Sequence, residues 1–278
     1  MNRAHAAVMA GFVATLAASS ARASSATGTL AMQFDGYAHG LTALKLAGTL
    51  TLAPQSYSGR LTVRTAGMIN WFAHLDSDST TSGHFAGDAV VPEHYDSTGT
   101  TRHEPRAMHM VYENGVPHIT SQEPAVDSER TPVPAAETAG SIDTLAAVAL
   151  LVRQVALSGK CDGNVRMFDG RRLTALTART VGEEKLAPSP KTHFNGEALR
   201  CDFEGTRLAG FIKADSLAQQ QAPRHGSAWL ATLIPGAPPV PVRVAFDNKV
   251  LGHVTLYLTS VSGSPGPMAQ NAARSNIQ

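Results

Sequence analysis

The sequence predicts a mainly β protein: a large curled antiparallel meander, forming an open barrel-like or spiral sheet, with one central α-helix. Short runs of alternating apolar and polar residues recur along most of the chain, separated by turn signals rich in glycine, proline, asparagine and aspartate. Only the segment 141–159 has apolar residues at helical spacing together with capping residues at both ends. A long meander curls, so we expect it to wrap partly around this helix.

The composition is that of an ordinary globular protein. The chain has 278 residues, of which 43% are hydrophobic and 16% are charged, and its formal net charge is +1. The sequence contains no block of like charges, which argues against a nucleic-acid partner. We therefore expect no nucleic acid among its ligands.

The N-terminus has the three parts of a secretory signal peptide. Arg3 precedes an uncharged, mostly apolar run over 6–18, and Ala21-Arg22-Ala23 fits the small-x-small cleavage rule. We expect cleavage near Ala23, which removes residues 1–23 and leaves a periplasmic or secreted protein. No later run reaches the about 18 apolar residues of a transmembrane helix, so we expect a protein that does not span the membrane.

The first part of the mature chain alternates in the manner of an antiparallel meander, and Asn114-Gly115 is its strongest hairpin dipeptide. The segment 67–74, which contains Trp71, is less regular and fits either a wide strand or a short helix. The strands expected here are 30–34, 41–52, 57–65, 84–91 and 106–112, with polar loops at 76–83 and 96–102.

A long proline-rich connection near 122–140 leads to the helix. Ser141 is the expected N-cap, and Asp143 lies in the first turn, where the helix dipole favours an acid. Gly159 supplies the C-terminal stop. The apolar stripe of this helix is expected to contain Ile142, Leu145, Val148, Val152 and Val155.

A hairpin follows the helix, with its turn at Asp169-Gly170. The later strands are expected at 192–195, 199–203, 207–213, 229–234, 240–246 and 250–261, with a loop at 182–190. Residues 262–278 lack any periodicity. We therefore expect a single β-rich domain over 24–261 and a disordered tail over 262–278.

Export determines how Cys161 and Cys201 are interpreted. Two lone cysteines pair by default in an oxidising compartment, and such a bridge closes a loop of 201 − 161 = 40 positions. A loop of this length corresponds to about 4 kcal/mol of stability in the chain-entropy model. Unpaired or redox-active thiols are the alternative, although the sequence contains no C-x-x-C motif.

Motifs that would indicate catalysis or metal binding are absent. The sequence contains no His-Glu-x-x-His, G-x-S-x-G or P-loop pattern, so we expect no metal, no cofactor and no catalytic residue. Met108-His109-Met110 offers thioethers of the kind that suit Cu(I), but alternate strand residues point to opposite faces and methionine is a common core residue. Core packing is the favoured interpretation.

The most distinctive polar feature is Phe168-Asp169-Gly170-Arg171-Arg172. It is interpreted first as a hairpin turn whose arginines face water or pair with nearby acids. The functional alternative is a bidentate contact from Arg171 and Arg172 to an anion or a partner at the sheet edge. Trp71 is a further candidate for contact with a ligand or partner.

Several features in their order along the chain resemble those of an exported bacterial family, the domain of unknown function 3108. These are SIDTLAAVALLVRQ over 141–154, Cys161, MFDGRRL over 167–173, Cys201 and the Pro-Val-Arg-Val strand at 241–244. The resemblance extends from Tyr37 to Leu258. It implies a secreted or periplasmic β-rich protein with paired cysteines, and it carries over no catalytic residues.

The architecture leads us to expect a non-enzymatic envelope protein that binds an apolar ligand, such as a lipid, or another envelope protein. The alternative is a hydrolase or transferase acting on an envelope polymer, which would require residues distant in sequence to converge. Metal storage or delivery through methionine and histidine is a third hypothesis.

Overall fold

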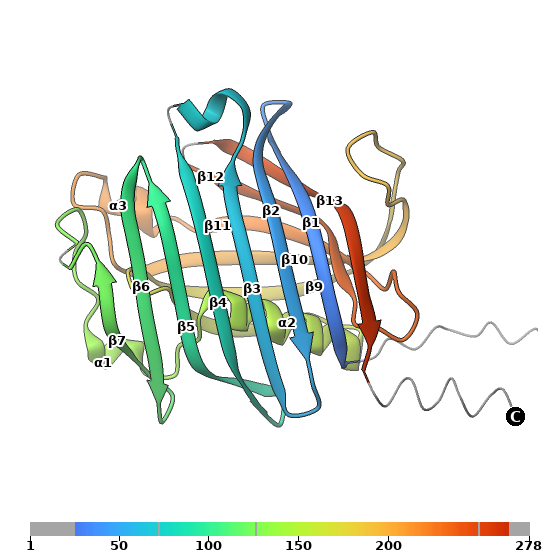
Figure 1. Cartoon of the computed structure of the whole chain (residues 1–278), viewed down its shortest axis with the longest axis horizontal. Helices are drawn as coiled ribbons and strands as arrows, with labels where there is room; N and C mark the ends of the chain where they lie inside the picture. The colour runs from blue at the N-terminus through green and yellow to red at the C-terminus, as the bar shows by residue number, and fades with distance from the viewer. Residues whose placement is uncertain (1–25, 72, 126, 250, 267–278) are drawn as a thin grey trace, which may run out of the picture.

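The computed structural model describes residues 26–266 except 72, 126 and 250. Within them, thirteen strands form one antiparallel sheet in the order β7-β6-β5-β4-β3-β2-β1-β13-β12-β11-β10-β9-β8 (Figure 1). Two meanders, β1 to β7 and β8 to β13, are joined where the first strand pairs with the last. The sheet stays open, with β7 and β8 as its edges, which confirms the predicted curled meander with one central helix.

The first meander consists of β1 (Gly28–Ala38), β2 (Leu41–Leu52), β3 (Ser56–Thr65), β4 (Leu75–Ala86), β5 (Ala89–Thr101), β6 (Glu104–Glu113) and β7 (Val116–Glu123). The second consists of β8 (Gly163–Phe168), β9 (Leu173–Leu186), β10 (Gly196–Ala209), β11 (Arg224–Ala231), β12 (Val240–Asn248) and β13 (Gly252–Pro265). Short helical segments are η1 (Gly67–Trp71), α1 (Ala135–Thr138) and α3 (Leu217–Gln221).

Several expected boundaries are wrong. The expected loops at 76–83 and 96–102 lie largely within β4 and β5, and most of the loop expected at 182–190 belongs to β9. These strands carry serine, threonine or charged residues on both faces, so they lack the apolar alternation that marks a half-buried strand. β13 also continues to Pro265, so the tail expected from 262 begins at least four residues too early.

Two of the sequence predictions fall on residues that are not described. The signal peptide at 1–23 and most of the tail, from 267 to 278, lie outside the described residues. Among the described residues, none of the helices has the length and apolar character needed to cross a bilayer.

The predicted helix is α2 (Thr144–Ser158), and its N-cap is Asp143 rather than Ser141. The Asp143 side chain accepts hydrogen bonds from two backbone N–H groups of the first turn, whereas Ser141 donates to a backbone oxygen. Gly159 ends the helix in the left-handed conformation, with φ 66°. Figure 1 shows α2 crossing behind the strands of the first meander, and it packs on β2 to β5 and β8.

The edge strand β8 is covered by the chain that leads into α2. Ile142 pairs with β8 through two backbone hydrogen bonds of 2.9 Å, from its N–H to Arg166 and to its carbonyl from Phe168. Two residues earlier, the Gly140 N–H donates to the carbonyl of Gly115 in the β6–β7 turn at 2.9 Å. The helix lead-in therefore links the two edges of the sheet without closing it.

Apolar side chains form two core clusters. The larger one surrounds α2 and includes Cys161 and Cys201, which form a disulfide with a Cα–Cα distance of 6.1 Å, as predicted. The smaller one joins the two meanders and contains Tyr95, Met108, Met110, Phe168, Leu173 and Ala209. The core role expected of Met108 and Met110 is therefore confirmed.

Candidate ligand-binding interior

The space inside the curled sheet is lined by apolar side chains that are buried at most positions and half-buried at others. Arg153 of α2 donates to the carbonyl of Pro54 in the β2–β3 turn, so the helix lies at the end of β3 opposite η1. Leu50 and Leu52, which face inward at the helix end, are buried. Leu46, further along β2 on the same face, is only half-buried. Leu44, the next inward residue toward η1, is buried again, so half-buried positions interrupt the apolar lining without forming a gradient along it.

The facing wall also contains half-buried apolar side chains. Val240 and Val242 of β12 are buried, whereas Val244 and Phe246, on the other side of the register shift between β11 and β12, are half-buried. The sheet register aligns Phe246 with Gly226 of β11, which in turn pairs with Phe203 of β10. Two half-buried aromatic side chains thus lie on either side of a glycine on the inner face.

A strip of hydroxyl groups runs along the inner face of β4 and β5. Ser77, Ser79 and Thr81 occupy successive inward positions of β4, and Ser97 pairs with Ser79 across the two strands. The Ser79 hydroxyl donates to Ser97 at 2.9 Å, and the Ser77 hydroxyl lies 3.4 Å from it. Thr81 is buried and the three serines are half-buried, so this part of the interior is polar and not an apolar core.

The strip ends at Asp143, which is fully buried. Oδ1 accepts from the N–H groups of Leu145 and Ala146 at 2.9 Å each, and Oδ2 accepts from the Thr81 hydroxyl at 2.9 Å. Burial raises the pKa of Asp143 to about 6, although the hydrogen bonds oppose this shift. Because both oxygens are engaged, the carboxyl group holds the helix end in place and is not free to act as a general acid.

Tyr112 places a further polar group in the interior. Its hydroxyl is buried and has no hydrogen-bond partner among the residues that the structure describes. Burial, followed by the charge of Asp143, raises the pKa of this hydroxyl above its ordinary value. An unpaired buried hydroxyl is costly, so a polar group of a ligand placed there would be stabilised.

Arg171 is committed to contacts within the fold. Its Nη1 lies 3.0 Å from Oδ2 of Asp127, and Nη2 donates to the backbone carbonyls of Glu123 and Ala107. The side chain is only 16% exposed. It therefore connects the β8–β9 turn to β6 and to the end of β7.

The other two candidate contacts are more accessible. Arg172 pairs with Asp169, with Nε 2.7 Å from Oδ2, and its side chain is 46% exposed. Trp71 ends η1, and its side chain is 84% exposed. Trp71 thus lies in η1, and the structure does not bring it together with the arginine pair.

Sequence patterns did not identify Arg207 or the inner serines as site residues. Arg207 follows Cys201 and Phe203 on the inner face of β10, where alternation alone would predict an apolar residue. The sequence signal that could have identified Arg207 is a charged residue at an inward strand position where the preceding inward residues are apolar. The inner serines give a similar signal, because they replace apolar residues at inward positions.

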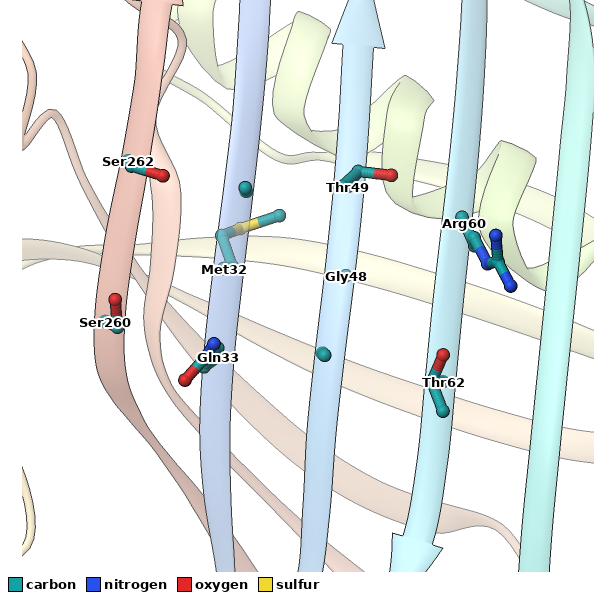
Figure 2. A pocket seen from close by; sticks show the side chains of 10 residues that line it. Met32, Gln33, Gly48, Thr49, Arg60, Thr62, Ser260 and Ser262 are labelled. Carbon is teal, nitrogen blue, oxygen red and sulfur yellow. The ribbon is translucent and has the colours of Figure 1, made fainter.

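A shallow depression of about 220 Å³ lies on the opposite face of the sheet, turned away from α2 (Figure 2). Its lining is mostly small or hydroxyl-bearing: Ala31, Met32, Gln33, Ala47, Gly48, Thr49, Arg60, Thr62, Ser260 and Ser262. Arg60 is already held by Asp78 at 2.7 Å. The depression therefore offers few free polar groups, and the interior is the better candidate.

One histidine makes a chain of hydrogen bonds that resembles part of a catalytic triad. His74 Nδ1 lies 2.9 Å from Oδ1 of Asn70, and Nε2 lies 2.9 Å from the Thr100 hydroxyl. Thr65 also donates to Asn70 at 2.7 Å, so the same bonds fix η1 to the sheet. Among the described residues, no group of three or more histidines, cysteines or acids is placed to hold a metal ion.

Comparisons with known proteins identify a family and two distant structural neighbours. The family model described as "Protein of unknown function (DUF3108)" matches residues 32–259. A crystal structure of a beta-barrel-like DUF1849 protein from Brucella abortus has 9% identity and a TM-score of 0.48, covering 87% of this chain and 100% of that one. A putative outer membrane lipoprotein-sorting protein domain from Vibrio parahaemolyticus has 10% identity and a TM-score of 0.32, with coverages of 92% and 93%. The curated proteins gave no significant match.

Proposed function

The chain belongs to the DUF3108 family of proteins of unknown function, and we propose that it is an exported, non-enzymatic envelope protein that binds a lipid-like ligand inside its curled sheet. The observation that carries this proposal is the mixed lining of the interior near η1. Half-buried apolar side chains from β2, β10 and β12 face the same space as the hydroxyl strip of β4 and β5. Ligand sites typically combine an apolar lining with a few polar groups in this way.

Export is part of the proposal and has two supports. The first is the tripartite N-terminus that ends at Ala23, which lies outside the described residues. The second is the buried Cys161–Cys201 disulfide, because such bonds persist in oxidising compartments. Together they favour the periplasm or the extracellular medium, where a soluble carrier of apolar molecules has a use.

Native mass spectrometry of the protein purified from its own envelope tests the proposal. We expect a co-purifying mass that organic extraction releases and identifies as a lipid-like molecule. The Ser77→Phe variant should lose this mass, because an aromatic ring there fills the half-buried inner position. Thr80→Phe, on the outer face of the same strand, is the matched control and should retain it. A clean apo mass for the wild-type protein would contradict the proposal.

Trp71 is the proposed point of ligand contact at the η1 end. Its exposed indole lies in η1, two residues after Ile69, which packs against the core, so the ring is held near the η1 end of the interior. We expect Trp71→Ala to slow ligand uptake without changing the melting temperature, since a side chain 84% exposed contributes little packing. Uptake is measured by the fluorescence of a lipid probe.

A hydrolase remains the second candidate because of the chain from Asn70 through His74 to Thr100. In that reading His74 Nε2 accepts the Thr100 proton and Asn70 orients the imidazole. The test is ester hydrolysis by the wild-type protein, Thr100→Val and His74→Ala. Activity lost in both variants would favour the hydrolase, whereas equal background rates in all three would exclude this site.

A further inference from the structure

Arg207 is an arginine on the inner face of the sheet without an acidic partner. It shares this face of β10 with Cys201 and Phe203, because residues two apart in a strand point to the same side. Its side chain is half-buried, and Nη1 donates to Oε1 of Gln220 at 3.1 Å. Within the part of the chain that the structure describes, no carboxylate lies within ion-pair distance of its guanidinium group.

Gln220 holds Arg207 in position but does not neutralise it. The glutamine is buried in α3, where its amide donates to the carbonyls of Ile212 and Asp215 at 2.9 and 3.3 Å. Its Oε1 also accepts from the Ile212 N–H at 2.7 Å. The glutamine is therefore fully bonded and rigid. A guanidinium group has five N–H donors, and this contact uses one of them.

Two other arginines lie near Arg207. Burial, followed by the positive charges of Arg172 and Arg130, lowers the pKa of Arg207 to about 10. The pKa of Arg130 is also lowered, first by burial and then by the positive charge of Arg172. Repulsion of this kind arises only among charges that are close together and poorly screened.

The charges of this cluster do not balance. It consists of four arginines and two carboxylates: Arg130, Arg171, Arg172, Arg207, Asp127 and Asp169. Arg130 and Arg171 share Asp127 at 3.6 and 3.0 Å. Arg172 forms an ion pair with Asp169. Four positive charges minus two negative ones leave an excess of two. Arg224 and Glu129, which also act on the cluster, cancel each other and leave this excess unchanged.

We propose that Arg207 binds the anionic group, a carboxylate or a phosphate, of a lipid-like ligand whose apolar part lies against Phe203 and Phe246. The identity of the apolar part rests on the proposed function. A half-buried positive charge without a counter-ion is costly, and an anion removes that cost. The planar fork of arginine matches the geometry of both anions. The ligand is therefore an anionic amphiphile rather than a neutral one.

The test compares amphiphiles that share one chain and differ in the head group. Binding of dodecanoate, dodecyl phosphate and dodecanol, each below its micelle concentration, is measured by displacement of a fluorescent probe near neutral pH. Inorganic phosphate is measured alongside by calorimetry. The proteins are the wild type, Arg207→Gln, Arg207→Lys and Arg179→Gln. Arg179 is exposed on the outward face of β9, so its variant loses the same charge away from the interior.

We expect the wild type and Arg179→Gln to prefer both anionic amphiphiles over dodecanol. Arg207→Gln should lose about ten- to a hundred-fold in affinity for the anions and keep its affinity for dodecanol. Arg207→Lys should recover part of this loss, because it restores the charge without the fork. A merely structural Arg207 would instead lower the melting temperature on substitution, whereas removal of an unpaired charge should preserve or raise it.

Other outcomes separate this inference from the proposed function. Equal binding of all three amphiphiles by the wild type, or an anion preference that survives in Arg207→Gln, overturns the anion site and leaves a lipid-binding interior standing. If no amphiphile binds, the proposed function fails. In that case Arg207-dependent binding of inorganic phosphate would still support an anion site, and its absence would overturn it.

Discussion

Thr81 of β4 donates a 2.9 Å hydrogen bond to Asp143, the N-cap of α2, across 62 positions of sequence. The bond fixes the only long helix of the described chain to the inner face of the sheet at a buried site. It also marks where the polar strip of β4 meets the apolar core. The helix end is therefore held by a polar contact, while the rest of the helix is held by packing.

Asp143→Asn should change how stability depends on pH. Burial raises the folded-state pKa of Asp143 to about 6 from 3.8, so the folded protein binds the proton more tightly than the unfolded chain does. The stability that this tighter proton binding contributes is fully present below about pH 4. It is lost as the pH rises to about 6, by about 3 kcal/mol in total. Asparagine keeps the capping oxygen and avoids the charge. Chemical denaturation should show Asp143→Asn gaining stability relative to the wild type over this range.

The comparison of the wild type with Asp143→Asn isolates Asp143, because the other carboxylates titrate in both proteins. This is needed since the pKa values of other carboxylates shift in the opposite direction. The pKa values of Asp78 and Asp169, for example, are below the ordinary value. Asp143→Ala is the control for capping and should be about 1–2 kcal/mol less stable than Asp143→Asn at every pH, because neither variant has the titrating carboxyl group. Parallel stability curves for the wild type and Asp143→Asn would show that the carboxyl group has an ordinary pKa.

Removing the disulfide should destabilise the protein without unfolding it locally. Both sulfurs are buried between the end of α2 and β10, and the bridge closes a loop of 40 positions. The Cys161→Ala/Cys201→Ala variant should lose about 4 kcal/mol in free energy of unfolding. The measurement is chemical denaturation of both proteins with and without reductant. The reductant should shift the denaturation curve of the wild type close to that of the variant. Identical curves for the two proteins without reductant would mean that the bond contributes nothing to stability.

Substitution of Arg171 should cost much more stability than substitution of Arg172. Arg171→Ala removes a partner of half-buried Asp127 and two contacts to backbone carbonyls, so we expect a loss of about 2–4 kcal/mol. Arg172→Ala removes a local pair whose arginine is 46% exposed, and Asp169 keeps hydrogen bonds from two backbone N–H groups, so we expect a cost below about 1 kcal/mol. Thermal melts of the two variants decide. Equal losses would argue against a role of Arg171 in joining the two meanders.

Local features of the fold were predictable because their causes are local. The left-handed turn at Asn114-Gly115, with φ 53° and 75°, is what this dipeptide favours, and Gly159 ends α2 as expected. The disulfide followed from export and the cysteine count. By contrast, β4 was missed because Ser77 and Ser79 occupy inward positions where an apolar pattern would mark a strand.

Long-range pairing and the candidate site were not predictable in the same way. The pairing of β1 with β13 joins the two ends of the described chain, and no turn between them specifies the register. Arg207 becomes notable only when Arg130, 77 positions away in sequence, lies near it and the acids are assigned to other arginines. The polar inward positions that obscured the strands are the same ones that now define the candidate site.

Two valines of α2, both expected on its apolar stripe, provide the last prediction. Val152 is 1% exposed within the core cluster around the helix, whereas Val148 is 37% exposed. Val152→Ala should cost about 2–3 kcal/mol, because it removes two buried methyl groups and leaves a cavity. Val148→Ala should be neutral or slightly stabilising, since alanine has the higher helix propensity. If thermal melts show equal effects, α2 is not the internal support of the sheet, and the interior that we assign to a ligand must have another boundary.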